Sequence, residues 1–229
     1  MKLFIIHGWT YTLGKWDELV ANLNDDFEVV MLKVPGLSQP SEKVWDVPAY
    51  VDWLNQQLAD EDKPAVIGHS NGGRIALAYA QAYPDKLSKL ILIDSAGIPR
   101  QSGGVSLKRK ILKPIAKALK PVVKGRARRG LYRLIGAHDY GNAPPNMRAT
   151  MQNMLNFDKE LDFSAVSVPT VIIWGEADTA TPLSDGLALA KKLQAASEPI
   201  IIKGAGHSPH ASHSAEVAAI IRQTMKDDE

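Results

Sequence analysis

The sequence contains no cysteine, so it can form no disulfide framework, catalytic thiolate or cysteine-ligated metal site. That composition suits a reducing compartment, and we expect a cytoplasmic protein. Long apolar runs are also missing. The N-terminal run from Leu3 to Ile6 is too short for the central region of a signal peptide or for a membrane span. We therefore expect no stable insertion into a membrane.

A strong excess of either charge is lacking too. The 27 Lys and Arg side chains nearly balance the 25 Asp and Glu side chains, which leaves a formal net charge of +2. No recognised nucleic-acid motif is present, so we expect no nucleic-acid partner. With 229 residues, of which 45% are hydrophobic, the chain suits one compact α/β domain with room for one insertion.

Short apolar stretches alternate with amphipathic ones along most of the chain. The apolar stretches predict strands at 3–6, 28–32, 65–68, 89–93, 170–174 and 199–203. Helical spacing predicts helices at 16–23, 47–58, 74–83, 184–193 and 215–225. This alternation is typical of an α/β fold with a doubly wound, mainly parallel sheet.

The alternation stops between residues 96 and 168, where the sequence becomes helical, basic and interrupted by prolines. We interpret this segment as a helical cap inserted into a core formed by residues 1–95 and 169–229. Its portion from 100 to 133 holds twelve Lys or Arg and no Asp or Glu. Three interpretations stay open: a solvated face on a lid helix, a site for an anionic substrate, or a weak contact with an acidic lipid surface.

The motif Gly68-His69-Ser70-Asn71-Gly72 fits the pattern G-x-S-x-G, in which a strand turns sharply into a helix and exposes the serine oxygen. Glycines at both ends relieve crowding in that strained turn. A plain glycine-rich turn, or a helix capped by Ser70, is the alternative. The predicted strand before the motif and the predicted helix after it favour a nucleophilic Ser70.

Four separated motifs resemble those of the α/β-hydrolase superfamily, in the superfamily's order. They are His7-Gly8-Trp9, the serine motif at 68–72, Trp174-Gly175-Glu176-Ala177-Asp178 and Gly204-Ala205-Gly206-His207. Each follows a predicted parallel strand, so all four loops can meet at one edge of the sheet. One departure is visible, because families of this fold usually carry two further strands before the His-Gly strand. Strand 28–32 would then lie at the sheet edge, where it could pair with a second copy of the chain.

The resemblance implies a catalytic triad in which His207 activates Ser70 and Asp178 orients His207, with an acyl-enzyme intermediate. The backbone N–H groups of Trp9 and Asn71 would form the oxyanion hole. We expect no cofactor and no metal. Asp94, which also follows a strand, is the main rival to Asp178; its expected role is to bond backbone N–H groups where the chain leaves for the cap.

Several other residues offer weaker alternatives. Glu176 lies two residues before the preferred acid. His7 and His69 are expected to be structural, since each holds a turn and cannot also face Ser70 as a base. The spacing of His210 and His213 behind His207 suggests a metal site, but no carboxylate cluster accompanies them.

The predicted function is that of a serine hydrolase that cleaves a small ester or related acyl compound, as a carboxylesterase does. Fold resemblance does not decide the chemistry, because the superfamily also includes C–C bond hydrolases, thioesterases, peptidases, lactonases and some lyases. A binding module that kept the fold without turnover is the alternative of a different class.

Overall fold

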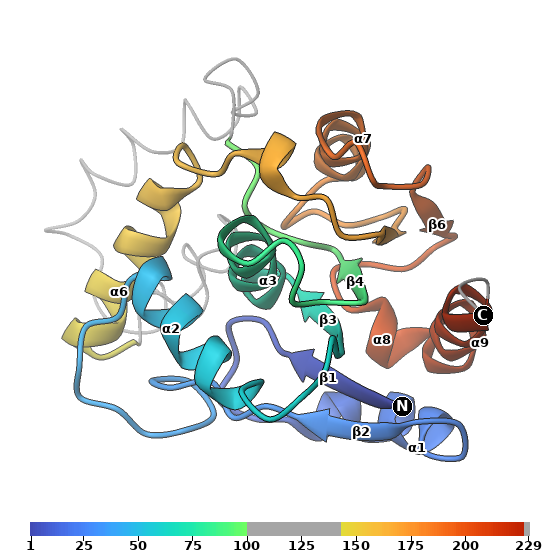
Figure 1. The fold of residues 1–229 in the computed structure, drawn as a ribbon, viewed down its shortest axis with the longest axis horizontal. Coiled ribbons are helices and arrows are strands. Elements are labelled where there is room, and N and C mark those ends of the chain that lie inside the picture. The colour runs from blue at the N-terminus through green and yellow to red at the C-terminus, as the bar shows by residue number, and fades with distance from the viewer. Residues whose placement is uncertain (100–142, 227–229) are drawn as a thin grey trace, which may run out of the picture.

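The computed structural model describes residues 1–99 and 143–226, which build one parallel sheet with helices on both faces (Figure 1). Its strands are β1 (Lys2–Ile6), β2 (Glu28–Met31), β3 (Ala65–His69), β4 (Lys89–Ile93), β5 (Thr170–Gly175) and β6 (Ile200–Ile202). They lie in the order β2-β1-β3-β4-β5-β6, and every neighbouring pair is parallel. The predicted doubly wound parallel sheet is confirmed.

Two layers of helices cover the sheet. One layer holds α1 (Asp17–Leu23), α8 (Pro209–Ser212) and α9 (Ser214–Lys226), and the other holds α2 (Val47–Gln57), α3 (Asn71–Ala82) and α7 (Leu183–Lys192). Helix α6 (Pro145–Phe157) lies beside α2, and two 3₁₀ turns occur at Gly14–Trp16 and Phe163–Ala165. The expected helices are present with their ends within three residues, the largest difference being α3, which begins at Asn71 and not at Arg74, whereas the short α8 was not predicted.

The alternation of side chains along β1 explains why both layers are needed. Leu3 and Ile5 pack into an apolar cluster with α1 and α9, whereas Phe4 and Ile6 pack into a second cluster with α2 and α3. All four are buried, because successive side chains of a strand point to opposite faces and both faces are covered. The continuous apolar run in the sequence is the signature of that arrangement.

The order of the strands opens a crevice at the carboxyl ends of β1 and β3. The chain passes from β1 to β2 on one side and then returns to place β3 on the other side of β1. Loops that leave β1 and β3 therefore diverge, and ligands bind at such switch points in open α/β sheets. Trp9 follows β1 and Ser70 follows β3, so both lie at this crevice.

Within the described strands β2 forms one edge of the sheet, as expected, and β6 forms the other. Of the predicted cap, 96–168, the structure describes α6 and its flanks, whereas the twelve basic residues between 100 and 133 lie outside the described residues. The division of the chain into core and cap stays a prediction.

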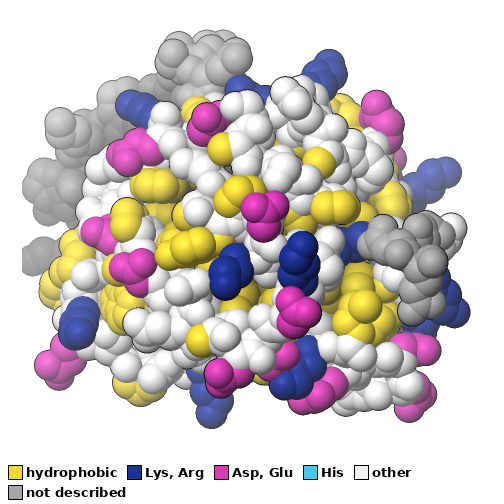
Figure 2. All heavy atoms as spheres, in the orientation of Figure 1, with side chains coloured by type: hydrophobic (Ala, Val, Ile, Leu, Met, Phe, Trp, Pro, Cys, Tyr) yellow, Lys and Arg dark blue, Asp and Glu magenta, His cyan; other side chains and the backbone are white. Residues whose placement is uncertain are grey.

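Charged side chains of both signs are interspersed on the face shown in Figure 2, with apolar side chains between them. This mixture agrees with the nearly balanced charge of the sequence. In the described part of the chain, no helix combines the length and the apolar character that a membrane crossing requires.

Candidate active site

Ser70 lies at a sharp turn between β3 and α3. Its φ of 51° falls in the left-handed region that residues other than glycine rarely adopt. The turn is held by the Ser70 N–H, which donates to Ile93 O at 3.1 Å, and by the Ala96 N–H, which donates to Ser70 O at 2.8 Å. Strain of this kind persists only where the surrounding structure imposes it, and it often marks functional sites.

The glycines of the motif are required by close packing. A β-carbon on Gly72 would lie 2.1 Å from Ile6 O, and one on Gly68 would lie 2.7 Å from the Gly73 Cα. Both neighbours are backbone atoms, which cannot move aside as a flexible side chain can. Glycine is therefore needed at both positions for α3 to pack this closely against the ends of β1 and β3.

We expect Gly72→Ala to destabilise the protein by more than ~3 kcal/mol, the range reached when a substitution forces backbone atoms apart. Urea unfolding measures the loss. Gly204→Ala is a matched control, because a β-carbon there meets nothing within 4 Å and only its φ of +71° opposes the change. Equal losses in both variants would contradict the packing explanation.

His207 joins Ser70 to Asp178 in one hydrogen-bonded chain. Its Nε2 lies 2.9 Å from Ser70 Oγ, and its Nδ1 lies 2.7 Å from Asp178 Oδ2. A neutral imidazole fits both contacts when Nδ1–H donates to the carboxylate and Nε2 accepts from the serine hydroxyl. The structure thus brings together the three predicted residues, from three loops at one edge of the sheet.

The carboxylate of Asp178 is held by several donors. Thr181 Oγ1 donates to Asp178 Oδ2 at 2.7 Å, and the Ala180 N–H donates to Oδ1 at 2.7 Å. Burial by itself would raise the pKa of Asp178, but the hydrogen bonds and the charge interaction with His207 outweigh burial and lower that pKa. Asp178 is therefore a stable anion beneath the histidine.

Asp94 lies close to the same histidine but is bonded differently. Its Oδ1 accepts from the Gly175 N–H at 2.8 Å, while Oδ2 is buried without a hydrogen-bond partner among the described residues. The expectation that Asp94 bonds N–H groups where the chain leaves β4 was wrong in position, because the donor belongs to the neighbouring strand β5. Asp94 is fully buried and has a φ of 42°.

Burial raises the pKa of Asp94 to about 7, opposed by the Gly175 N–H and reinforced by the charge of Asp178. Because the pKa of Asp94 in the folded protein lies above the ordinary value of 3.8, its protonated carboxyl favours the folded state more than its ionised carboxylate does. Its contribution is complete below pH 3.8 and is lost as pH rises through about 7.

We expect wild-type protein to lose about 2 kcal/mol more stability than Asp94→Asn between pH 5 and pH 8. Asparagine keeps an oxygen for the Gly175 N–H and cannot ionise. Urea unfolding of both proteins across this range measures the difference, in which contributions from groups that do not interact with Asp94 cancel. Identical pH dependence would show that Asp94 does not titrate in this window.

Trp9 and Asn71, whose backbone N–H groups are the predicted oxyanion donors, follow β1 and β3 respectively. Trp9, Ser70 and Asn71 all line a cavity of about 400 Å³. Neither the Trp9 N–H nor the Asn71 N–H donates to an acceptor within the described residues. Unpaired N–H groups beside a nucleophile are what a developing oxyanion requires.

A family model described as "Alpha/beta hydrolase family" matches residues 3–220. The chain belongs to the alpha/beta hydrolase family. It is 25% identical over 252 residues to the pimeloyl-(acyl-carrier protein) methyl ester esterase of Neisseria meningitidis serogroup B, with 98% of this chain and 93% of that protein covered. The shared fold agrees with the four motifs from which the resemblance was inferred.

Two solved structures show the same fold. An alpha/beta hydrolase enzyme from the metagenome of sediments from the lagoon of Mar Chica, Morocco, superimposes with a TM-score of 0.74 at 19% identity, covering 100% of this chain and 91% of that chain. A thermophilic esterase from Thermogutta terrifontis gives a TM-score of 0.67 at 22% identity, covering 99% and 90%. These likenesses extend over the whole chain rather than the motifs alone.

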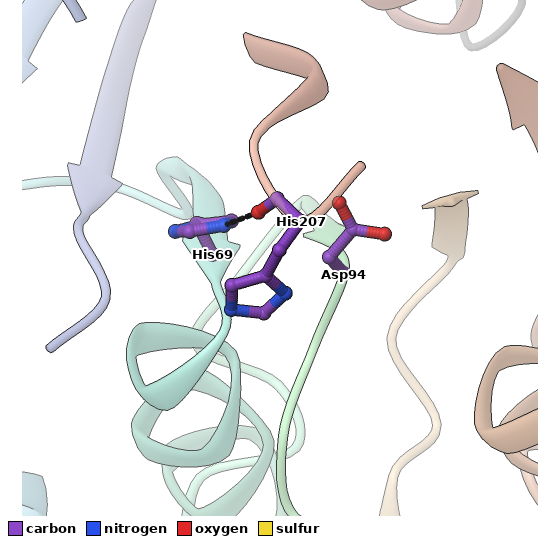
Figure 3. Close-up of side chains that lie close together, drawn as sticks. All are labelled: His69, Asp94 and His207. Carbon is purple, nitrogen blue, oxygen red and sulfur yellow. Dashed lines mark hydrogen bonds between the residues drawn. The ribbon is translucent and has the colours of Figure 1, made fainter. Parts of the chain in front are cut away.

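Three further histidines contact residues of neighbouring loops and helices. His69 Nε2 donates to the backbone oxygen of His207 at 2.7 Å (Figure 3), and burial lowers the pKa of His69 well below its usual value. His7 Nε2 contacts Ser38 Oγ at 2.6 Å, and His210 stacks on Trp16. The neutral His69 thus holds the loop that carries His207.

Two further candidates lie apart from the reaction centre. His213 contacts Ser212 Oγ at 2.8 Å, and Glu176 accepts from the Gly204 N–H at 3.0 Å. Neither contacts the Ser70 to Asp178 chain.

One group of side chains could hold a metal ion, formed by His69, Asp94 and His207, whose ligand atoms lie within 4.8 Å of one another (Figure 3). Both ring nitrogens of His207 already take part in the chain from Ser70 to Asp178. His69 Nε2 is also occupied. A metal ion would therefore have to displace the contacts of the serine site.

An ion pair that the sequence did not reveal lies in the cavity wall. Arg74, four residues after Ser70, bonds Asp158 through Nε at 2.5 Å and through Nη2 at 3.0 Å. Both side chains are buried, and the pair ties the end of α6 to α3. The sequence offered one sign of this ion pair: Arg74 is the one charged residue of α3, whose other residues are mostly small or apolar.

Proposed function

We propose that this protein is a carboxylic ester hydrolase that uses Ser70, His207 and Asp178 as a catalytic triad, with a small acyl ester as its substrate. The hydrogen-bonded chain from Ser70 through His207 to Asp178, at the wall of a cavity of about 400 Å³, is the observation that carries the proposal. The name of the Neisseria relative, a methyl ester esterase, supports the same class of reaction.

In the proposed mechanism, His207 Nε2 takes the proton of Ser70 as the serine oxygen attacks the ester carbonyl carbon. Asp178 holds Nδ1–H and stabilises the imidazolium that forms. The N–H groups of Trp9 and Asn71 bind the oxyanion. His207 then protonates the leaving alcohol, and water activated by the same histidine releases the acid.

A fluorophosphonate probe tests the proposal, because it labels a serine only when the serine is activated. We expect labelling of Ser70, confirmed by mass spectrometry of the modified peptide, together with hydrolysis of short acyl esters. Hydrolysis without labelling of Ser70 would overturn the assigned nucleophile. Labelling of Ser70 without turnover of any ester, thioester or peptide would favour a binding module.

The basic segment at 100–133 is proposed to favour anionic acyl substrates. We expect charge reversal at Lys108, Arg109 and Lys110 to lower kcat/KM for an anionic ester relative to a neutral ester several-fold at low salt. The difference should shrink at high salt, since screening weakens long-range attraction. An unchanged ratio at low salt would instead indicate a solvated basic face.

Association of two copies through the edge strand β2 stays a prediction, as does a cytoplasmic location. β2 offers a partner chain the free edge that pairing requires, within the part of the sheet the structure describes. Sedimentation at two protein concentrations measures the oligomeric state.

A further inference from the structure

Helix α3 begins without the side-chain cap that usually holds the start of a helix. Ser70 occupies the N-cap position but makes no capping side-chain bond to the described residues, and its Oγ lies 2.9 Å from His207 Nε2. The helix then opens with Asn71, Gly72 and Gly73, and glycine gives a backbone wide conformational freedom. A side-chain contact that restrains Asn71 therefore bears directly on where its backbone N–H points.

Such a contact spans the two glycines. Arg74 Nη1 donates to Asn71 Oδ1, and residues three positions apart lie on the same face of a helix. A guanidinium carries only donors, so the amide atom that faces it is the oxygen. Both side chains are buried, which leaves little water to compete for the hydrogen bond. The contact therefore restrains the first turn of α3.

Arg74 is itself fixed by Asp158, at the C-terminal end of α6. Its Nε donates to Asp158 Oδ1 at 2.5 Å and its Nη2 donates to Oδ2 at 3.0 Å, which makes the contact bidentate. A guanidinium is planar and rigid, so two fixed nitrogens also fix the direction of the third, Nη1. The position of Asp158 thus determines where Arg74 meets Asn71.

The energetics of a buried ion pair indicate that orientation is what this pair contributes. Desolvation of the two charges opposes their attraction, so apolar residues of similar volume often stabilise a fold equally well. An apolar pair could join α3 to α6, but it could not orient the amide of Asn71. Helix α6 also contributes Met151 and Leu155 to the cavity lining. The pair therefore connects one wall of the cavity to the turn after Ser70.

We propose that Arg74 and Asp158 are positioning residues, which hold Asn71 so that its backbone N–H is directed at the oxyanion of the transition state. The inference rests on the proposed ester hydrolysis. Neither side chain has to touch the reacting atoms. Because the oxyanion forms only after the substrate has bound, a loss of this positioning lowers kcat and leaves KM nearly unchanged.

Two single variants test this role. Asp158→Asn places an amide nitrogen against one donor of Arg74 and breaks the bidentate contact, whereas Asn71→Ala removes the oxygen that Arg74 holds and keeps the backbone N–H. Turnover is expressed per active site, counted by complete reaction of Ser70 with a fluorophosphonate, so that misfolded protein does not enter the rate. We expect each variant to lower kcat at least about tenfold with KM within about threefold, since small displacements of a catalytic group have effects of this size.

The double variant shows whether Asp158 acts through Asn71. Once residue 71 is alanine, Arg74 has no amide oxygen to hold there, so Asp158→Asn should lower kcat per active site no further. A direct effect of Asp158 on the substrate would instead multiply with the loss caused by Asn71→Ala.

A trifluoromethyl ketone gives a second measurement. The oxygen of Ser70 bonds to the ketone carbon and its proton passes to His207, which leaves a tetrahedral oxyanion bound at the site. The Ki of this inhibitor should rise in each single variant by the same factor by which kcat/KM for the ester falls.

Asp26→Asn is a matched control, because it breaks an ion pair of the same length in the other layer of helices. There Arg222 Nε lies 2.5 Å from Asp26 Oδ2, and both side chains are partly exposed. This variant should keep the wild-type kcat per active site and the wild-type Ki.

A wild-type kcat per active site in either Asp158→Asn or Asn71→Ala would overturn the inference, as would losses that multiply in the double variant. If Asp158→Asn fails to fold, Arg74→Lys takes its place in the same comparison, because lysine keeps the charge but lacks the planar guanidinium. In every case, turnover that disappears in Ser70→Ala leaves the proposed function standing. Turnover that persists in Ser70→Ala would overturn the proposed function itself.

Discussion

Ser70→Ala is expected to reduce ester hydrolysis by a factor on the order of a million and to abolish labelling by a fluorophosphonate. Alanine removes the attacking oxygen and adds no bulk to the turn. The φ of 51° at this position is equally strained for serine and alanine, so the fold should not change. Initial rates on a short acyl ester measure the first effect, and thermal unfolding checks the second.

Ser164→Ala is a matched control for this substitution, because Ser164 is exposed and its hydroxyl donates to Asp162, away from the cavity. It should retain wild-type rates. Full activity in Ser70→Ala would contradict the mechanism.

His207→Ala should cause a loss similar to that in Ser70→Ala, since His207 Nε2 lies 2.9 Å from Ser70 Oγ and is the proposed base for that oxygen. The double variant should lose little more than either single variant, because residues that act as one unit are not additive. Losses that multiply in the double variant would indicate that the two residues act independently.

Asp178→Asn is expected to lower turnover about ten-thousand-fold with little effect on stability. The amide nitrogen of asparagine would face His207 Nδ1, where Asp178 Oδ2 now lies at 2.7 Å. A donor there favours the histidine tautomer whose Nε2 carries the proton, and that tautomer cannot accept the proton of Ser70. Steady-state kinetics and thermal unfolding of the purified variant measure both quantities.

Asp94→Asn is the informative counterpart, because Asp94 follows the neighbouring strand and is also buried close to His207. Its Oδ1 already accepts from the Gly175 N–H, so we expect turnover within about tenfold of wild type. A steep loss confined to Asp94→Asn would show that the acid of the triad belongs to β4 and not to the loop after β5.

The environments of the two carboxyl groups explain why their pKa values move apart. Donors from Thr181, Ala180 and His207 lower the pKa of Asp178, whereas burial raises that of Asp94 to about 7. Two neighbouring carboxyl groups with opposite shifts take different roles. In the proposed mechanism Asp178 is the anion that orients His207, whereas the raised pKa of Asp94 means that this carboxyl holds its proton more tightly.

The sequence by itself determined the fold class and the serine motif. Buried parallel strands must be apolar on both faces, so β1, β3 and β4 are visible as short apolar runs. The sharp turn at Ser70 admits no β-carbon at Gly68 or Gly72, so packing leaves its mark directly in the sequence. The apolar runs of the strands and the glycines of the turn are both patterns among neighbouring residues, so both can be recognised in the sequence.

The tertiary structure alone decided which distant groups meet. Asp94 and Asp178 both follow apolar strands, and only the fold shows that His207 Nδ1 contacts Asp178 while Asp94 bonds the neighbouring strand. The pairing of Arg74 with Asp158 likewise joins residues 84 positions apart. Contacts of this kind depend on how helices and loops pack in space, so they become visible only once that packing is known.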